Sequence, residues 1–69
     1  MYTVTETVKR NEETEYTTYG IAMLRDNCAE IILSDISPDL NFVNSIVRKC
    51  NKYNAAPEHV IDIVYDSIV

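Results

Sequence analysis

Ser37-Pro38-Asp39 divides this chain of 69 residues into two halves with different hydrophobic periods. Before it, apolar residues and threonines alternate with a period of two, which is typical of β-strands. After it, apolar residues recur every three or four positions, which is typical of α-helices. We therefore expect a single domain with a small sheet over residues 1–36 and a helical hairpin over residues 37–69.

Three strands are expected before Ser37. In residues 2–9, threonines at positions 3, 5 and 7 alternate with mostly apolar residues, and β-branched side chains are frequent, which suits a pleated strand. A polar run then turns the chain into a second strand at about 15–25. Asp26-Asn27 tolerates the left-handed backbone of a tight hairpin, and a third strand follows over about 28–36. The prediction is a three-stranded antiparallel meander.

The register of these strands depends on their loops. A two-residue turn at Asp26-Asn27 makes three pairs of residues face each other and share one side of the sheet: Leu24 with Ala29, Ala22 with Ile31, and Gly20 with Leu33. The other side holds Tyr19, Ile21, Met23, Cys28 and Ile32. An even-length first loop adds Tyr2, Val4 and Val8 to the Tyr19 side. An odd-length loop would place these residues on the other side of the sheet. We expect the helices to cover the Tyr19 side.

Two helices are expected after Ser37. This residue is placed to cap the first helix, with Pro38 at its first position and Asp39 near the positive end of its dipole. Asn54 suits the left-handed position that ends a helix. The apolar half of the first helix holds Leu40, Phe42, Val43, Ile46, Val47, Cys50 and Tyr53.

Pro57 opens the second helix, and the short connection before it makes the two helices an antiparallel hairpin. Packed on one face of the sheet, the hairpin gives an α+β domain of order βββαα. The expected apolar stripe of the second helix is Val60, Ile61, Val64, Tyr65 and Ile68. The residues expected between helices and sheet are Val43, Val47, Cys50, Val60, Val64 and Ile68, against Ile21, Met23 and Ile32.

Composition and charge exclude several partners. Eleven acidic side chains against six basic ones give a net charge of −5, which repels a phosphate backbone, so we expect no nucleic acid. No apolar run approaches the roughly 18 residues that span a bilayer, so we expect no membrane partner. The N-terminus lacks the basic start and apolar run of a signal peptide. With Cys28 and Cys50 as free thiols, the protein is expected in the cytoplasm.

Chemistry-bearing residues are few. His59, Asp62 and Asp66 share one face of the second helix and would present an imidazole and two carboxylates to a metal, although the ordinary interpretation of such a face is a solvated polar surface opposite a core stripe. Cys50 belongs to the core, and no base can be assigned to Cys28. We therefore expect no enzyme and no cofactor.

Tyrosines and the single glycine have structural interpretations. Packing explains Tyr2, Tyr19, Tyr53 and Tyr65, which all fall at positions expected to face the core. Gly20 inside a strand indicates a bulge or a close approach of backbone.

An apolar patch on the face away from the helices is the most informative functional feature. It comprises Ala22, Leu24, Ile31 and Leu33. Either a partner covers this patch or the protein exposes it, and large exposed patches mark interaction sites. The leading hypothesis is a small interaction module that forms a homodimer or binds another protein. The alternative is a small ligand- or metal-binding regulatory protein using His59, Asp62 and Asp66.

Three segments carry a resemblance to a known family: Tyr19-Gly20-Ile21, Asp35-Ile36-Ser37 and the run from Pro57 to Val64. The chain resembles a family of short, uncharacterised bacterial proteins, mostly from Firmicutes, whose domain has no known function. The resemblance covers most of the chain from Tyr16 onward and departs at Tyr65-Asp66-Ser67, where a more acidic tail is expected. It implies a small cytoplasmic bacterial protein and supplies no catalytic residues.

Overall fold

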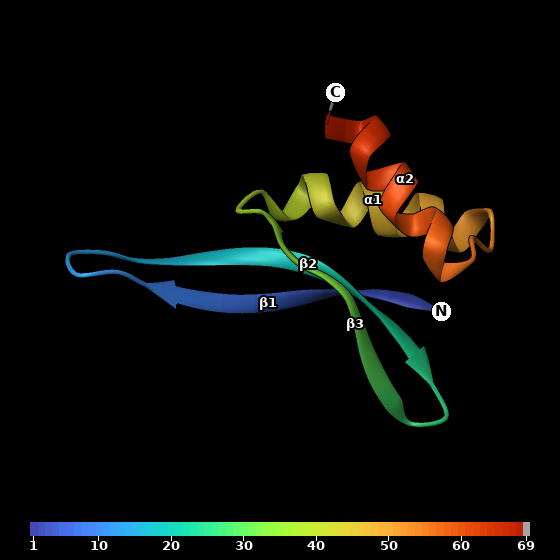
Figure 1. Cartoon of the computed structure of the whole chain (residues 1–69), viewed down its shortest axis with the longest axis horizontal. Coiled ribbons are helices and arrows are strands. Elements are labelled where there is room, and N and C mark those ends of the chain that lie inside the picture. Colours follow the sequence, from blue (N-terminus) through green and yellow to red (C-terminus); the bar gives the residue numbers. More distant parts are fainter. Residues whose placement is uncertain (69) are drawn as a thin grey trace.

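The computed structural model describes residues 1–68 and has the predicted order of elements (Figure 1). The strands β1, β2 and β3 pair antiparallel in that order, and both helices lie on the same side of the sheet. This is the predicted βββαα arrangement of the α+β class. None of the helices in residues 1–68 is long and apolar enough to cross a membrane. The elements are β1 (Tyr2–Arg10), β2 (Glu15–Arg25), β3 (Cys28–Ser37), α1 (Leu40–Lys52) and α2 (Pro57–Ile68).

The first hairpin has a loop of even length, which settles the side on which β1 presents its residues. Arg10 pairs with Glu15, Val4 pairs with Ile21 and Tyr2 pairs with Met23. The Asn11 side chain holds the loop, because its Oδ1 accepts hydrogen bonds from the backbone N–H groups of Glu13 and Thr14 at 3.2 and 2.9 Å. Tyr2, Val4 and Val8 therefore lie on the Tyr19 side, as expected for an even loop.

The second hairpin turns at Asp26 and Asn27, whose φ angles are 49° and 67°. Two consecutive positive φ angles are those of a type I′ turn, which matches the twist of the flanking strands. The predicted pairs of Leu24 with Ala29 and of Ala22 with Ile31 are both formed. The predicted pair of Gly20 with Leu33 is wrong, because Leu33 pairs with Ile21.

A bulge in β3 explains this shift of register. The pairing slips between Ala22 and Ile21 and again between Ile21 and Tyr19, which pairs with Ser37. A Cβ atom added at Gly20 would lie 2.3 Å from the carbonyl oxygen of Leu33, so the backbone of β3 lies directly against this glycine. Only a residue without a side chain allows such an approach, which confirms the interpretation of Gly20.

The N-cap of α1 is Asp39, not Ser37 as predicted. Asp39 has an extended backbone, and its carboxylate accepts hydrogen bonds from the N–H groups of Asn41 and Phe42 at 3.0 and 3.3 Å. Ser37 instead accepts from the N–H of Asp39 at 3.0 Å. Both residue types cap helices, and the carboxylate adds a favourable charge at the positive end of the helix dipole.

The C-terminus of α1 is closed as predicted by Asn54, which has a φ of 50°. The N–H of Asn54 donates to Asn51 and the N–H of Ala55 donates to Cys50, at 3.2 and 3.0 Å. This pair of bonds is a Schellman motif, which satisfies carbonyl groups at the end of the helix and turns the chain toward α2.

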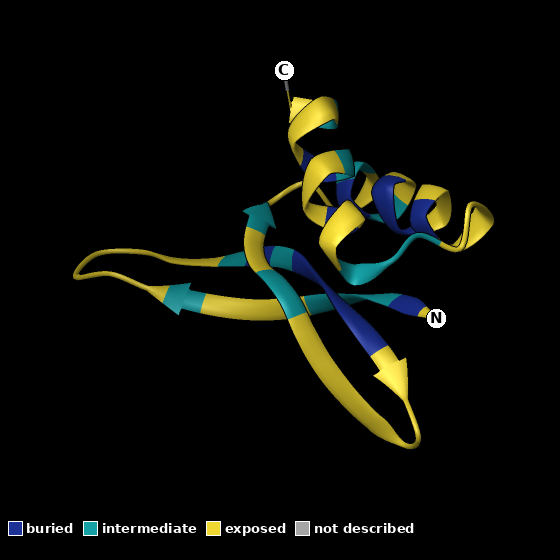
Figure 2. Ribbon diagram, turned by 45° about the vertical axis from the view of Figure 1, so that its right-hand side comes forward, coloured by how far each residue is buried: buried dark blue, intermediate teal, exposed yellow. Residues whose placement is uncertain are grey.

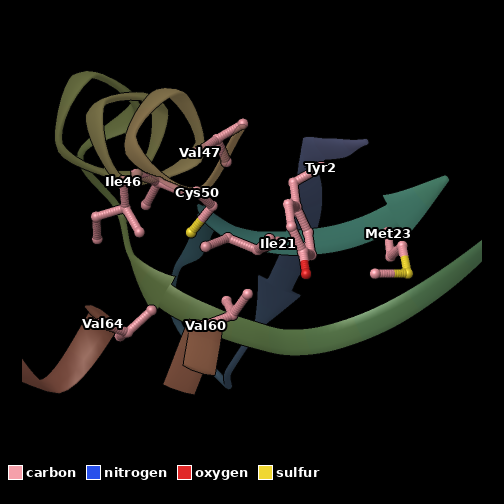
Figure 3. Close-up of a cluster of buried hydrophobic side chains, with 9 residues drawn as sticks. Tyr2, Ile21, Met23, Ile46, Val47, Cys50, Val60 and Val64 are labelled. Carbon is pink, nitrogen blue, oxygen red and sulfur yellow. The ribbon is translucent and has the colours of Figure 1, made fainter. Parts of the chain in front are cut away.

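The core lies between the helices and the Tyr19 side of the sheet, as predicted (Figure 3). Ile32, Leu33 and Ile36 of β3 pack against its edge. Its buried members come from every element except β3: Tyr2, Ile21, Met23, Val43, Ile46, Val47, Cys50, Val60 and Val64.

Three residues predicted to face the core are exposed instead. The exposed fractions are 67% for Tyr53, 64% for Tyr65 and 58% for Ile68. Tyr53 is the C-cap of α1 and thus lies beyond its last full turn. α2 is rotated relative to the predicted stripe, since its covered side runs through Val60, Ile63, Val64 and Ser67. The sequence did not fix this rotation because apolar residues occupy more than half of the circumference of the helix.

Candidate interaction surfaces

The predicted patch on the far face of the sheet is smaller than expected. Leu24 and Ile31 are exposed by 46% and 64%, and the pairing of β2 with β3 places them at neighbouring positions. Ala22, which pairs with Ile31, is buried. Leu33 does not belong to this patch, because the bulge in β3 places it opposite Ile21, where it packs against the core.

A second apolar surface runs along α2, and the sequence alone did not separate it from the core. It consists of Ile61, Tyr65 and Ile68, which we call the α2 ridge. Their spacing of four and three residues places them on one side of the helix, and all three are exposed. Glu58 and Asp62 border the ridge on its solvent side, and α2 has no basic residue in its last turn. The ridge is therefore apolar with an acidic margin.

The candidate metal ligands lie on the polar face of α2 that adjoins the ridge, with Asp62 at the border between the two. His59, Asp62 and Asp66 are all exposed. Within residues 1–68, no group of three or more His, Cys, Asp and Glu side chains is arranged to hold a metal ion. The structure thus brings no further ligand to these three side chains.

The two cysteines are free, and they occupy different environments. Cys28 is exposed beside the second hairpin turn, whereas Cys50 is buried in the core. Burial raises the pKa of the Cys50 thiol above its ordinary value. A buried thiol held neutral is a packing residue rather than a nucleophile.

The outer edge of β1 is a third candidate surface, and two hydrogen bonds define which of its backbone groups are free. The N–H of Leu24 donates to the carbonyl of Met1 at 2.7 Å, and the N–H of Asn11 donates to the carbonyl of Thr14 at 2.9 Å. Residues of an antiparallel strand alternate between bonding the neighbour and pointing away from it. Odd-numbered residues of β1 therefore bond β2, and even-numbered residues point their N–H and C=O groups outward.

One end of this edge is capped by α1. The N–H of Tyr2 donates to Oδ1 of Asn51 at 2.7 Å, and Nδ2 of Asn51 donates to the carbonyl of Tyr2 at 3.0 Å. The Asn51 side chain thus takes the place of a neighbouring strand. The Tyr2 hydroxyl donates to the carbonyl of Ala55 at 2.5 Å, and burial raises the pKa of this phenol.

A polar cluster ties the hairpin of β1 and β2 to the bulge of β3. The Asp35 carboxylate accepts a hydrogen bond from the Thr18 hydroxyl at 2.7 Å and lies 3.0 Å from Nζ of Lys9. These two contacts lower the pKa of Asp35, with Thr18 as the larger cause, and the same carboxylate raises the pKa of Lys9. Asp35 itself has a φ of 56°, which the bulge imposes.

Beyond this cluster, both hairpins project past the helices (Figures 1 and 2). Figure 2 shows that their tips are exposed, while the buried residues lie where the helices cover the sheet. The accessible surface is 5067 Å² and the radius of gyration is 12.4 Å. A compact monomer of this size would have about 4,400 Å² and about 11 Å. The chain therefore exposes more surface than a compact fold requires.

Fold and surfaces together define a small α+β protein with a sheet covered on one side by a helical hairpin. The whole chain, residues 1–69, matches the model of a family described as "Family of unknown function (DUF6514)", and the protein belongs to this family. The resemblance to an uncharacterised family is thereby confirmed, and the match includes the N-terminal residues before Tyr16. An origin in Firmicutes stays a prediction. No curated protein and no solved structure matches the chain.

Proposed function

We propose that this protein is a small cytoplasmic interaction module, which acts by binding protein chains, its own included, rather than by catalysis. The observation that carries the proposal is the α2 ridge. A helix packed on a core through one side usually presents polar residues elsewhere. α2 instead presents Ile61, Tyr65 and Ile68 to solvent.

The composition of the exposed surfaces supports a protein partner. Aromatic side chains such as Tyr65 are enriched at the centres of protein interfaces, which are also more apolar than the rest of the surface. The α2 ridge and the Leu24–Ile31 patch lie on different elements, so one chain has apolar surface for more than one contact. The net charge of −5 disfavours nucleic acid as the partner.

The proposed compartment is supported by the cysteines. Cys28 is exposed and unpaired, and Cys50 is buried and unpaired. Free thiols persist in the reducing cytoplasm, where disulfides are rare.

The experiment compares two variants that each add one negative charge at an exposed helical position. Ile68→Asp alters the α2 ridge, and Asn41→Asp is the control on α1. Sedimentation equilibrium over a wide concentration range measures self-association, and capture from a lysate of the source organism measures other partners. We expect Ile68→Asp to lose a self-association or a captured protein that wild type and Asn41→Asp retain. A monomer at every concentration, together with identical captured proteins for all three chains, would contradict the proposal.

A further inference from the structure

The outer edge of β1 offers unpaired backbone groups to another strand. The N–H and C=O groups of Glu6, Val8 and Arg10 point away from β2, by the alternation that the bonds at both ends of the strand define. Asn51 caps Tyr2, but no side chain of residues 1–68 forms a hydrogen bond with the backbone of these three residues. An open edge of this kind is a template for an added strand.

The side chains along this edge are complementary to themselves. Glu6 lies two residues before Val8, and Arg10 lies two residues after it. When two copies of β1 pair antiparallel about a two-fold axis at Val8, each Glu6 faces Arg10 of the second copy. The two Val8 side chains, each 56% exposed in one chain, then face each other. Facing pairs of opposite charge and facing β-branched pairs both stabilise a sheet.

Neighbouring registers lack this complementarity. An axis at Glu6 places two glutamates opposite each other, which is destabilising. An axis at Thr7 places Glu6 opposite Val8 and leaves both charges without a partner. Even-numbered residues face even-numbered residues in all three registers, so the backbone bonds do not discriminate among them. The charges therefore select the axis at Val8.

Arg10 can take part without giving up its contact within the chain. Its Nε and Nη2 atoms both donate to Oε2 of Glu15, at 3.2 and 2.8 Å. A guanidinium group has five N–H donors, so Nη1 is left for a second carboxylate. The Arg10 and Glu15 side chains are exposed, by 76% and 54%. A second copy can therefore reach this guanidinium from solvent.

The shape of the chain suits the same partner. The hairpin of β1 and β2 projects beyond the helices (Figure 1), and a lone two-stranded ribbon is only marginally stable in water. Pairing two such hairpins produces a four-stranded ribbon without an open edge at its centre. The exposed area exceeds that of a compact chain by an amount of the same order as the ~800 Å² that each partner buries in a standard interface.

We propose that a second copy of this chain binds along the outer edge of β1, antiparallel and about a two-fold axis at Val8, with Glu6 of each copy paired to Arg10 of the other. This inference rests on the proposed function and names its partner and surface. It extends the sheet across the dimer, and it leaves the α2 ridge free on each copy.

A charge-reversal cycle tests the pairing. Glu6→Arg and Arg10→Glu each replace two attractive pairs of the dimer with two repulsive ones, so each should raise the dimer dissociation constant about tenfold or more. The chain with both substitutions restores opposite charges and should return to within about threefold of wild type. Glu30→Arg on β3 makes the same charge change as Glu6→Arg and is the control, which should leave the constant unchanged. Far-UV circular dichroism verifies that each variant is folded.

Cysteine cross-linking tests the register in a Cys28→Ser background, where Cys50 remains buried. Facing residues of a hydrogen-bonded pair have Cα atoms about 5.5 Å apart, which a disulfide can bridge. Val8→Cys should therefore form an intermolecular disulfide on mild oxidation. Thr7→Cys and Glu6→Cys should not, and efficient cross-linking of either in place of Val8→Cys would overturn the proposed axis.

The position of the substitutions that dissociate the dimer distinguishes the β1 edge from the α2 ridge. If wild type dimerises, but Ile68→Asp dissociates it and the charge-reversal variants do not, the partner lies on the α2 ridge and the β1 inference is wrong. If wild type stays monomeric at every concentration, the β1 inference is also wrong. In that case the capture experiment alone decides whether the protein is an interaction module.

Discussion

The two ends of β1 belong to one continuous strand and are held in different ways. At its start, Tyr2 is buried under the helices, its backbone is bonded by Asn51 and its hydroxyl by Ala55. At its end, Val8 is exposed and its own backbone groups point away from β2, so only its odd-numbered neighbours bond that strand. The pairing with β2 is regular along the whole length. The strand ladder therefore extends beyond the helices, whereas the burial that stabilises the fold does not.

Truncation of apolar side chains at the two ends should give the largest contrast. Ile21, which pairs with Val4 under the helices, is fully buried, so Ile21→Ala should destabilise the fold by about 2–5 kcal/mol. Val8→Ala should change the stability of the dilute monomer by less than about 0.5 kcal/mol. Urea denaturation at low protein concentration measures both values. Equal losses would mean that the hairpin tip is covered in the monomer, against its observed exposure.

At the boundary between the two regions, Gly20 should not tolerate an added side chain. An added methyl group would lie 2.3 Å from a backbone oxygen of β3 and 2.8 Å from Cα of Ser34, so β3 must move. We expect Gly20→Ala to destabilise the fold by about 1–3 kcal/mol, as overpacking does. Ser34→Ala, on the same bulge but exposed, is the control. Thermal denaturation that leaves Gly20→Ala as stable as the control would show that the bulge is not fixed here.

The hydroxyl of Tyr2 should contribute less to the stability of the fold than the side chain of Ile21 does. Tyr2→Phe keeps the ring in the core but removes the hydrogen bond to the Ala55 carbonyl. We expect a loss of about 1 kcal/mol in the free energy of unfolding. Tyr16→Phe, at an exposed position of the projecting hairpin, should lose almost nothing. If both variants lost the same amount in urea denaturation, the contact with Ala55 would be unimportant in solution.

The smallest expected effect is a loss of local stability in acid, where Asp35 holds the projecting hairpin to β3. The Thr18 hydroxyl and then Lys9 hold the pKa of Asp35 below its ordinary value in the folded chain. The stability that this carboxylate contributes is therefore present above the ordinary pKa and lost as pH falls through the folded pKa. The protection of the amides of residues 6–17 against hydrogen exchange, measured relative to the intrinsic rate at each pH, should fall over that acidic range. Asp35→Asn should abolish the pH dependence, and an unchanged profile would remove Asp35 as its source.

Local sequence signals predicted the elements well because each signal lies within a few residues. Asp26-Asn27 fixed its hairpin turn, and Asn54 ended α1 with the expected positive φ. The N-cap was misplaced because Ser37 and Asp39 both suit that position.

The register of Leu33 and the rotation of α2 were predicted wrongly because each depends on contacts between distant segments. The shift of Leu33 requires β3 to lie against Gly20, thirteen positions earlier in the chain. The rotation of α2 depends on how its wide apolar arc meets the sheet and α1. The predicted patch kept Leu24 and Ile31 because they lie near the turn, where the register follows from the loop alone. The rotation of α2 is what exposes the α2 ridge, so the ridge could not be predicted from the sequence.

The cap of Asn51 on Tyr2 has a consequence for the order of folding. It joins residues 49 positions apart, and the bond from Tyr2 to Ala55 joins residues 53 apart, so each closes almost the whole chain. Closing a long loop costs conformational entropy before any contact compensates for it. We therefore expect the two hairpins and the helical pair to form early and Tyr2 to dock after the transition state. Stopped-flow kinetics should then show Tyr2→Phe unfolding faster than wild type while folding at the same rate.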